Sequence, residues 1–214
     1  SDVAKENGAL FLLDACQSVG QMVIDTKKIG CDFLAATGRK FMRAPRGTGF
    51  LYANEDSLKN LEPSFLDFSS VDFLDGEFQV KKDAKRFEHY ETNFAARLGL
   101  GKAVDYALAL GMEAIEQRVQ ALAKNLRASL RTFSQVTVHD TGTHQSGIVT
   151  FTVKGHDSYS LAQKLREKKI NLSVFHPNYS PDLQHRKLPP VLRASVHYYN
   201  TEEEIEKLKE HLKV

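Results

Sequence analysis

An unbroken apolar run near the start of the chain, residues 9–13, is the feature that most limits the folds available to it. A continuous run of this kind is typical of a strand buried on both faces, which implies a parallel sheet covered by helices. The next expected strands, at residues 33–36 and 49–53, are too few to complete such a sheet. We therefore expect an α/β fold, and we expect these 214 residues to be a fragment of it.

Two helices are expected in the middle of the chain. Residues 94–110 are apolar on all sides, which predicts a buried helix that ends at Gly111. The segment after it carries a single apolar stripe, which predicts a helix on a surface. The stripe consists of Ile115, Val119, Leu122, Leu126, Leu130 and Phe133.

Short strands alternate with helices beyond this stripe. Strands are expected at residues 136–138, 148–153, 170–174 and 192–199, with a helix near residues 161–168. Thr201 opens a last helix, because Thr201 and Glu204 have the spacing of a capping box. Four prolines predict an irregular loop over residues 176–190. The alternation predicts a small α/β or α+β C-terminal domain over residues 112–214, which follows a first domain over residues 1–111.

Composition excludes several classes of protein. With 29 Lys and Arg against 27 Asp and Glu, the formal charge is only +2, so no nucleic-acid partner is expected. The apolar runs fall far short of the roughly 20 residues that a membrane helix needs, so no membrane partner is expected either. Two cysteines without a secretory leader favour a reducing compartment, which we take to be the cytosol. No metal ligands are predicted.

Asp14 is the first candidate for chemistry. It ends the apolar run, and a carboxylate at the carboxyl end of a buried strand lies where open α/β sheets bind ligands. Burial of this charge is costly unless a cation or a hydrogen-bond donor meets it. Asp is also a favoured helix cap. On periodicity alone, a capping role and a ligand-binding role for Asp14 are equally well supported.

A second polar group follows the strand expected at residues 33–36. Thr37, Arg39 and Lys40 place a hydroxyl, a guanidinium and an amine within four residues, a set that can hold a phosphate beside a reactive nitrogen. Such a lysine can form a Schiff base with a carbonyl cofactor. The alternative is a solvated basic turn. The glycines of residues 46–49 match neither the P-loop nor the dinucleotide fingerprint, so no nucleotide site is predicted.

Five segments of the sequence are informative as a set. They are Leu13-Asp14-Ala15-Cys16-Gln17-Ser18-Val19-Gly20, Gly30-Cys31-Asp32-Phe33-Leu34, Thr37-Gly38-Arg39-Lys40, Arg46-Gly47-Thr48-Gly49-Phe50-Leu51-Tyr52, and Arg193-Ala194-Ser195 followed by Tyr199-Asn200-Thr201 and by Glu204-Ile205. In this order and spacing the chain resembles the class V aminotransferase family, which are pyridoxal-phosphate enzymes that include cysteine desulfurases and isopenicillin N epimerase. The resemblance covers nearly the whole chain.

The resemblance implies a cofactor site with a role for each matching residue. Lys40 is the lysine that holds pyridoxal phosphate as an internal aldimine and moves the Cα proton of the substrate. Asp14 pairs with the ring nitrogen of the cofactor, and Gln17 hydrogen-bonds its phenolic oxygen. Thr37 and Arg39 hold the phosphate, although desulfurases commonly have His where this chain has Arg39.

The resemblance also implies a substrate, a partner and a larger protein. Arg193 is the arginine that clamps the carboxylate of an amino-acid substrate. Residues 87–93 fall where the family reaches the cofactor of a partner subunit in a homodimer, and Thr92 is the candidate there. The chain resembles the second half of a fold type I enzyme: the end of the large domain, then the small domain.

One departure from the desulfurases concerns their reactive thiol. Desulfurases carry a cysteine on a mobile loop shortly before the carboxylate-binding arginine, but residues 175–190 contain none. Cys16 and Cys31 both precede Lys40. Cys16 is placed to line the cofactor pocket, whereas Cys31 is expected to be a small buried side chain. A persulfide-forming desulfurase mechanism is therefore not expected.

The sequence leads to one enzyme hypothesis and one rival. The first is a cytosolic, homodimeric pyridoxal-phosphate enzyme that acts on an amino acid by loss of its Cα proton. Transamination, epimerisation and elimination of a sulfur or other β-substituent share that first step, and the sequence does not choose among them. The rival is a truncated or degenerate binding or assembly module of the same fold, which is not catalytic.

Overall fold

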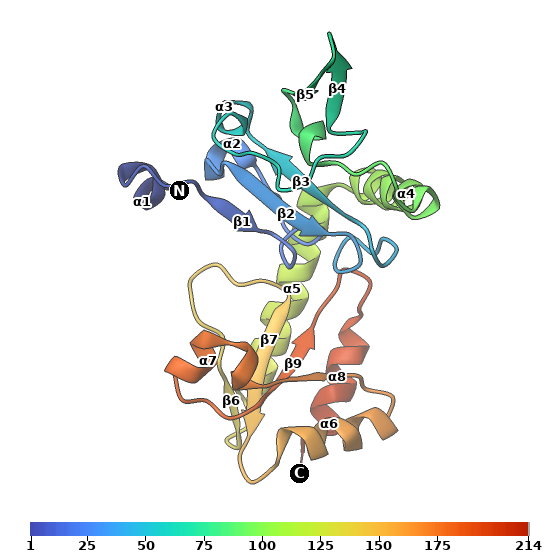
Figure 1. The fold of residues 1–214 in the computed structure, drawn as a ribbon. Coiled ribbons are helices and arrows are strands. Elements are labelled where there is room, and N and C mark those ends of the chain that lie inside the picture. The colour runs from blue at the N-terminus through green and yellow to red at the C-terminus, as the bar shows by residue number, and fades with distance from the viewer. Residues whose placement is uncertain (214) are drawn as a thin grey trace. The chain divides into compact units, whose positions relative to one another are not determined.

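A computed structural model describes residues 1–213 as two compact units, Ser1–Met112 and a second unit from Glu113 onward. Strands and helices are mixed in both units, so the expected α/β class is confirmed (Figure 1). Among the residues described, none of the helices combines the length and the apolar character that crossing a bilayer requires.

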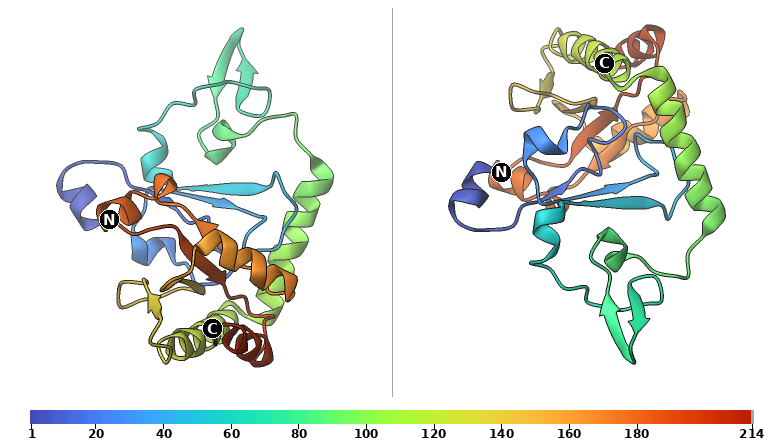
Figure 2. Two further views of the ribbon diagram at one scale, coloured as in Figure 1. Left: turned by 90° about the horizontal axis from the view of Figure 1, so that it is seen from below. Right: turned by 90° about the horizontal axis from the view of Figure 1, so that it is seen from above.

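The first unit is built around a three-stranded sheet in the order β1-β2-β3. Its elements are α1 (Asp2–Glu6), β1 (Leu12–Asp14), α2 (Thr26–Ile29), β2 (Phe33–Thr37), β3 (Gly49–Ala53), α3 (Glu55–Leu58), β4 (Val71–Leu74), β5 (Glu77–Val80), the 3₁₀ helix η1 (Ala84–Phe87) and α4 (Phe94–Leu110). β4 and β5 pair only with each other, and their hairpin extends away from the sheet in the views of Figures 1 and 2.

The sheet differs from the expected parallel, covered sheet in two ways. β1 and β2 are parallel, with Asp14 opposite Ala35, but β3 runs antiparallel to β2. The strand expected at residues 9–13 starts only at Leu12, and that side chain is 56% exposed. Among the described residues no strand pairs with the outer edge of β1, and a strand at an open edge is not buried on both faces.

The helix α4 forms where it was expected, but the prediction that it is buried is wrong. Gly111 ends it with a backbone φ of 88°, as the sequence indicates. Of its side chains only Ala107 is buried, whereas Leu98 is 77% and Leu108 is 63% exposed. An all-round apolar helix needs neighbours on all sides to be buried, and the first unit covers only part of it.

The second unit is a four-stranded antiparallel sheet in the order β6-β7-β9-β8. Its elements are α5 (Met112–Leu130), β6 (Val136–Val138), β7 (Ile148–Val153), α6 (Ser158–Glu167), β8 (Ser173–Phe175), the 3₁₀ helix η2 (Pro177–Tyr179), α7 (Pro181–His185), β9 (Val191–Ser195) and α8 (Glu202–Glu210). The striped helix, the capping box at Thr201 and the strand at residues 148–153 form as expected. The strands expected at residues 170–174 and 192–199 form with shifted or shorter bounds.

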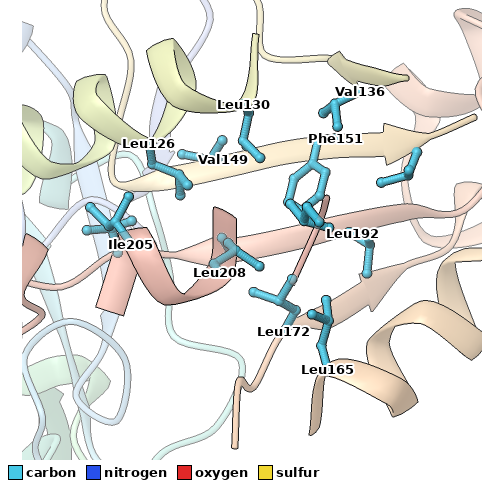
Figure 3. Close-up of a cluster of buried hydrophobic side chains, with 14 of the residues drawn as sticks. Leu126, Leu130, Val136, Val149, Phe151, Leu165, Leu172, Leu192, Ile205 and Leu208 are labelled. Carbon is cyan, nitrogen blue, oxygen red and sulfur yellow. The ribbon is translucent and has the colours of Figure 1, made fainter. Parts of the chain in front are cut away.

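One face of this sheet carries the core. Residues alternate along β7, so that Val149, Phe151 and Val153 are buried while the residues between them are half-exposed. Leu126 and Leu130 of α5 and Ile205 of α8 lie over this face, as Figure 3 shows. Alternation with a period of two lets an antiparallel strand bury one face and leave the other free. The opposite face is therefore available for polar side chains.

The proline-rich segment 176–190 is not the irregular loop that was predicted. It contains η2 and α7, and each begins with a proline, Pro177 and Pro181. The side chains of His176 and Ser180 each accept a backbone N–H from the turn that follows them. A proline at the first helical position loses no hydrogen bond, because the N–H there has no partner within the helix. The four prolines therefore mark helix starts as well as breaks.

Candidate active site

Two parallel strands of the first unit end at the same edge, and the candidate residues follow those ends. Asp14 is the last residue of β1 and Thr37 the last of β2, and the N–H of Ala15 still donates to the carbonyl of Ala35 over 2.9 Å. Carboxyl ends of neighbouring parallel strands open onto one crevice, where α/β sheets bind ligands. The sheet thus places a carboxylate beside a hydroxyl.

The carboxylate of Asp14 is held by the residue two positions on. Its Oδ1 accepts the backbone N–H of Cys16 at 2.9 Å. Hydrogen bonding from Cys16, together with the positive charge of Lys40, holds the pKa of Asp14 below its usual value. The chain forms a turn here rather than a helix, so Asp14 caps a turn and still remains exposed. Its capping and ligand-binding roles are compatible.

Lys40 lies in the loop that joins β2 to β3. The loop is closed at its base, where the N–H of Gly38 donates to the carbonyl of Thr48 over 2.8 Å. The hydroxyl of Thr48 donates to the carbonyl of Pro45 over 2.7 Å, which fixes the returning arm. A Cβ on Gly38 would lie only 2.3 Å from the Thr48 hydroxyl, so this packing requires glycine. Lys40 is half-buried on this loop.

Gly20 brings the turn after Asp14 against the backbone that follows Lys40. Its φ is +91°, and a Cβ there would lie 2.5 Å from the backbone nitrogen of Met42 and 2.8 Å from the carbonyl oxygen of Phe41. Only glycine combines this φ with such a close approach. The glycine therefore fixes the distance between the segment of Asp14 and the segment of Lys40.

The remaining candidates of the first unit are less closely joined. Gln17 is half-buried on the turn after Asp14, and its carbonyl accepts the side-chain amide of Gln21. Arg39 is exposed on the loop of Lys40. Thr92 lines a pocket of about 660 Å³ together with Thr48 and with residues of β3, η1 and α4. The other candidates of this unit do not line that pocket, but the hydroxyl of Thr37 donates to the carbonyl of Thr48, which does.

Arg193 belongs to the second unit, on the face of the sheet away from the core. It pairs with Thr150 of β7 and Ser173 of β8, and its Nε donates to the Ser195 hydroxyl at 3.2 Å. Burial lowers the pKa of the guanidinium. Within residues 1–213 no carboxylate forms an ion pair with it. A partly buried guanidinium without a carboxylate partner is suited to an anionic ligand.

Two residues that were quoted in the sequence motifs without a role make structural contacts. Asp32 accepts the N–H of Phe11 at 2.7 Å and the hydroxyl of Ser57, and thereby joins the residue before β1 to α3. Gly20 is the second. A glycine that follows a strand-end carboxylate by a few residues signals a tight turn, but the sequence does not show which backbone approaches it.

The sequence matches the family described as aminotransferase class-V over residues 1–208. A probable cysteine desulfurase of Methanothermobacter thermautotrophicus is 34% identical over 215 aligned positions, which cover 98% of this chain and 54% of that protein. The chain thus spans about half the length of the curated relatives it matches.

Solved structures also resemble this chain, again over about half of their own length. A cysteine desulfurase from Thermococcus onnurineus, in its apo form, superposes with a TM-score of 0.88 at 29% identity, over 98% of this chain and 53% of that one. The cystine C–S lyase C-DES, in complex with its product cysteine persulfide, superposes with a TM-score of 0.82 at 28% identity, over 95% of this chain and 52% of the lyase. A variant of C-DES carries glycine covalently linked to its PLP cofactor.

Proposed function

Since the chain belongs to the aminotransferase class-V family, we propose that it forms part of a pyridoxal-phosphate enzyme that cleaves the C–S bond of a sulfur-containing amino acid. The observation that carries this proposal is the placement of Asp14 and Lys40 at one edge of the sheet, close enough for the lysine to influence the pKa of the carboxylate. The names of the relatives supply the C–S bond as the target.

The residues at this edge fit the cofactor chemically. A protonated pyridine nitrogen needs an anionic partner, and the lowered pKa of Asp14 keeps its carboxylate charged at neutral pH. Covalent attachment of a cofactor through its carbonyl group needs a primary amine, which Lys40 supplies. A phosphate needs donors, and Thr37 and Arg39 follow β2 with a hydroxyl and a guanidinium. We propose these roles for the four residues, with Gln17 toward the phenolic oxygen.

When bound, pyridoxal phosphate withdraws electrons from Cα of an amino acid and so makes the Cα proton acidic. In the proposed reaction Lys40 would take that proton, because it supplies a primary amine on the loop after β2, at the same edge of the sheet as Asp14. The electron pair of the Cα–H bond then forms the Cα=Cβ double bond, and the sulfur leaves Cβ with the electrons of the C–S bond. Asp14 would keep its negative charge throughout and pair with the protonated ring nitrogen.

We propose elimination rather than sulfur transfer to a protein thiol. The segment of residues 175–190 lies just before β9 and contains no cysteine. It is occupied by η2 and α7. Cys16 lies at the turn after Asp14, and Cys31 is buried, with 1% of its surface exposed. Neither is in the position where the desulfurases of the resemblance carry their reactive thiol. A C–S lyase among the structural relatives supports this choice.

We also propose that the active form is larger than this chain. Its relatives are about twice as long, and the first unit exposes apolar side chains on α4 and on the β4–β5 hairpin, Phe73 at 64% and Phe78 at 68% among them. Surfaces of this kind are usually covered in the working protein. The proposed cover is the remaining half of a longer polypeptide and a second copy in a homodimer, with Thr92 directed toward the partner's cofactor.

The proposed function is tested by adding pyridoxal phosphate to the complete protein. We expect a visible absorption band that borohydride bleaches, and peptide mass mapping should then find the pyridoxyl group on Lys40. A protein that shows no such band at saturating cofactor would instead favour the binding or assembly module. A band together with release of sulfide or persulfide from cysteine or cystine would identify the C–S bond as the one cleaved.

Replacement of Arg193 by alanine should weaken amino-acid binding while the cofactor stays bound. A charge-assisted hydrogen bond contributes about 1.5–3 kcal/mol, and about 1.4 kcal/mol is a factor of ten, so we expect roughly a 10- to 100-fold loss per contact. Arg193→Lys keeps the charge without the planar fork and should recover only part of the loss. The measurement is a titration of the cofactor absorbance with amino acid.

The exposed Arg166 of α6 provides the matched control for this titration. Arg166→Ala removes an arginine from the same unit and should leave amino-acid binding unchanged. Equal affinities in wild type and Arg193→Ala would place the carboxylate site elsewhere.

Conversion of both cysteines to serine should leave sulfur release from cystine intact. Elimination needs no protein thiol to accept sulfur, whereas a persulfide mechanism needs one, and Cys16 and Cys31 are the only two in the chain. The measurement is steady-state sulfur release by the Cys16→Ser, Cys31→Ser double variant. Loss of turnover with normal cofactor absorbance would contradict the elimination mechanism.

A further inference from the structure

The helix α4 contains a glycine at a position where alanine would form a better helix. Gly99 lies in the interior of α4, and glycine loses more conformational freedom there than alanine does. The structure shows what this glycine allows. A Cβ on Gly99 would lie 2.7 Å from Cγ and 3.2 Å from Cδ of Pro45, which belongs to the loop of Lys40. Gly99 therefore lets α4 and that loop come into close contact.

Two further contacts join α4 to the same loop. A Cβ on Gly38 would lie 3.1 Å from Cδ1 of Leu100, so this helix residue packs on the start of the loop. The guanidinium of Arg43 lies over the ring of Tyr106, 5.8 Å from its centroid. Tyr106 follows Gly99 by about two helical turns and therefore lies on the same face of α4. The loop thus packs along one face of the helix.

A displacement of Pro45 would reach Lys40 through the backbone. The side chain of proline is a ring closed on its own backbone nitrogen, so a push on its Cγ moves the main chain. The N–H of Ala44 donates to the carbonyl of Gly38 over 2.9 Å and closes the stretch that contains Lys40. Within this stretch the N–H of Arg43 donates to the carbonyl of Lys40 over 2.9 Å. Pro45 thus directly follows a hydrogen-bonded unit that includes Lys40.

We propose that Gly99 is a positioning residue of this active site, because its missing side chain lets Pro45 pack against α4 and so fixes the loop that carries Lys40. The role of Lys40 as the reactive amine rests on the proposed function, whereas the packing rests on contacts within the first unit. A displacement of about 1 Å can lower the rate of a reaction about a hundredfold. The position of the loop on α4 therefore matters for catalysis.

The first test needs no cofactor and measures the loop itself. Exchange of the Ala44 amide hydrogen, which is bonded to Gly38, is followed in the complete protein. In Gly99→Ala we expect exchange to be roughly tenfold faster than in wild type, because the added Cβ displaces Pro45 and weakens the bond beside it. Gly101→Ala is the matched control in α4. A Cβ there would meet nothing within 4 Å, so the exchange rate should not change.

The second test measures turnover of the complete protein with pyridoxal phosphate. Gly99→Ala should lower kcat by about 10- to 100-fold and change KM for the amino acid by less than about twofold, since Arg193 belongs to the second unit. Pro45→Ala removes the Cγ and Cδ that a Cβ at position 99 would strike. In the Gly99→Ala background it should restore most of the lost turnover, whereas a general loss of stability predicts a further decrease.

A pair of variants at Tyr106 tests the contact with Arg43. Tyr106→Leu removes the ring beneath the guanidinium and should accelerate exchange of the Ala44 amide about two- to fivefold, which corresponds to an exposed cation–π contact. Tyr106→Phe keeps the face of the ring and should leave the exchange rate unchanged. These two variants also provide the test if Gly99→Ala does not fold, and equal exchange in both would then overturn the proposal.

The outcomes separate this proposal from the proposed function. Equal exchange of the Ala44 amide in wild type and Gly99→Ala would overturn the proposal, as would an equal acceleration in Gly101→Ala. An unchanged kcat in Gly99→Ala would show that the packing does not position Lys40. If the complete protein binds no pyridoxal phosphate, the proposed function fails, and the exchange rates alone decide whether α4 fixes the loop.

Discussion

Replacement of Lys40 by alanine is expected to abolish covalent attachment of the cofactor and to lower turnover by at least about a hundredfold, and up to about ten-thousandfold. This range is what a positioned acid–base group contributes. The loop of Lys40 is closed by the bond between Gly38 and Thr48, and residues 38–48 contain no other lysine that could take its place. Turnover is measured with the complete protein at saturating pyridoxal phosphate.

Two further variants decide what Lys40 contributes. Lys40→Arg keeps a positive charge near Asp14 but lacks a primary amine, so it should be as inactive as the alanine variant. Lys59→Ala removes an exposed lysine after α3 and should retain full turnover. A pyridoxyl group found on another lysine of the wild-type protein would contradict the assignment of Lys40.

Loss of the Arg127 side chain is expected to destabilise the second unit by about 3–5 kcal/mol, because removal of one partner leaves the other charge buried and unpaired. Arg127 Nε donates to Asp140 at 2.7 Å, and the two side chains are only 6% and 9% exposed. Arg127 also donates to the carbonyls of Ser146 and Ile148, at 2.8 Å each. Asp140 in turn accepts the N–H and hydroxyl of Thr150.

This network connects α5 to the segment that leads into β7. Its loss should therefore destabilise that part of the second unit, which amide hydrogen exchange can detect. We expect hydrogen exchange of the β7 and β9 amides in Arg127→Ala to accelerate by the factor that corresponds to the lost free energy. Arg131→Ala, an exposed residue just after the end of α5, is the control and should change exchange little. A loss below about 1 kcal/mol, the value typical of exposed ion pairs, would show that the buried pair does not hold the unit together.

The two units show different degrees of predictability from sequence. In the second unit the stripe of α5 predicted a helix that forms as expected, because one-sided burial leaves a periodic pattern in the sequence. In the first unit the run at residues 9–13 predicted a strand buried on both faces, yet Leu12 is exposed. An apolar run indicates what a segment can bury. It does not show whether the rest of the chain supplies the cover.

The residue types of the candidate site were determined by the sequence itself. An aspartate after an apolar run, and a threonine, an arginine and a lysine after the next, already named Asp14, Thr37, Arg39 and Lys40. The spacing of the segments pointed to the family that the comparisons then identified. These features are local or depend on order along the chain, so they can be read without coordinates.

Only the tertiary structure decided how these residues meet. It brought Gly20 against the backbone of Met42. It also paired Arg127 with Asp140 across the start of β7. Each of these contacts joins two separate segments whose spacing in the sequence follows no helix or strand period. The contacts depend on where the chain turns and on which atoms pack between the segments. Hydrogen bonds and close packing act over a few ångströms, and only the folded chain sets those distances.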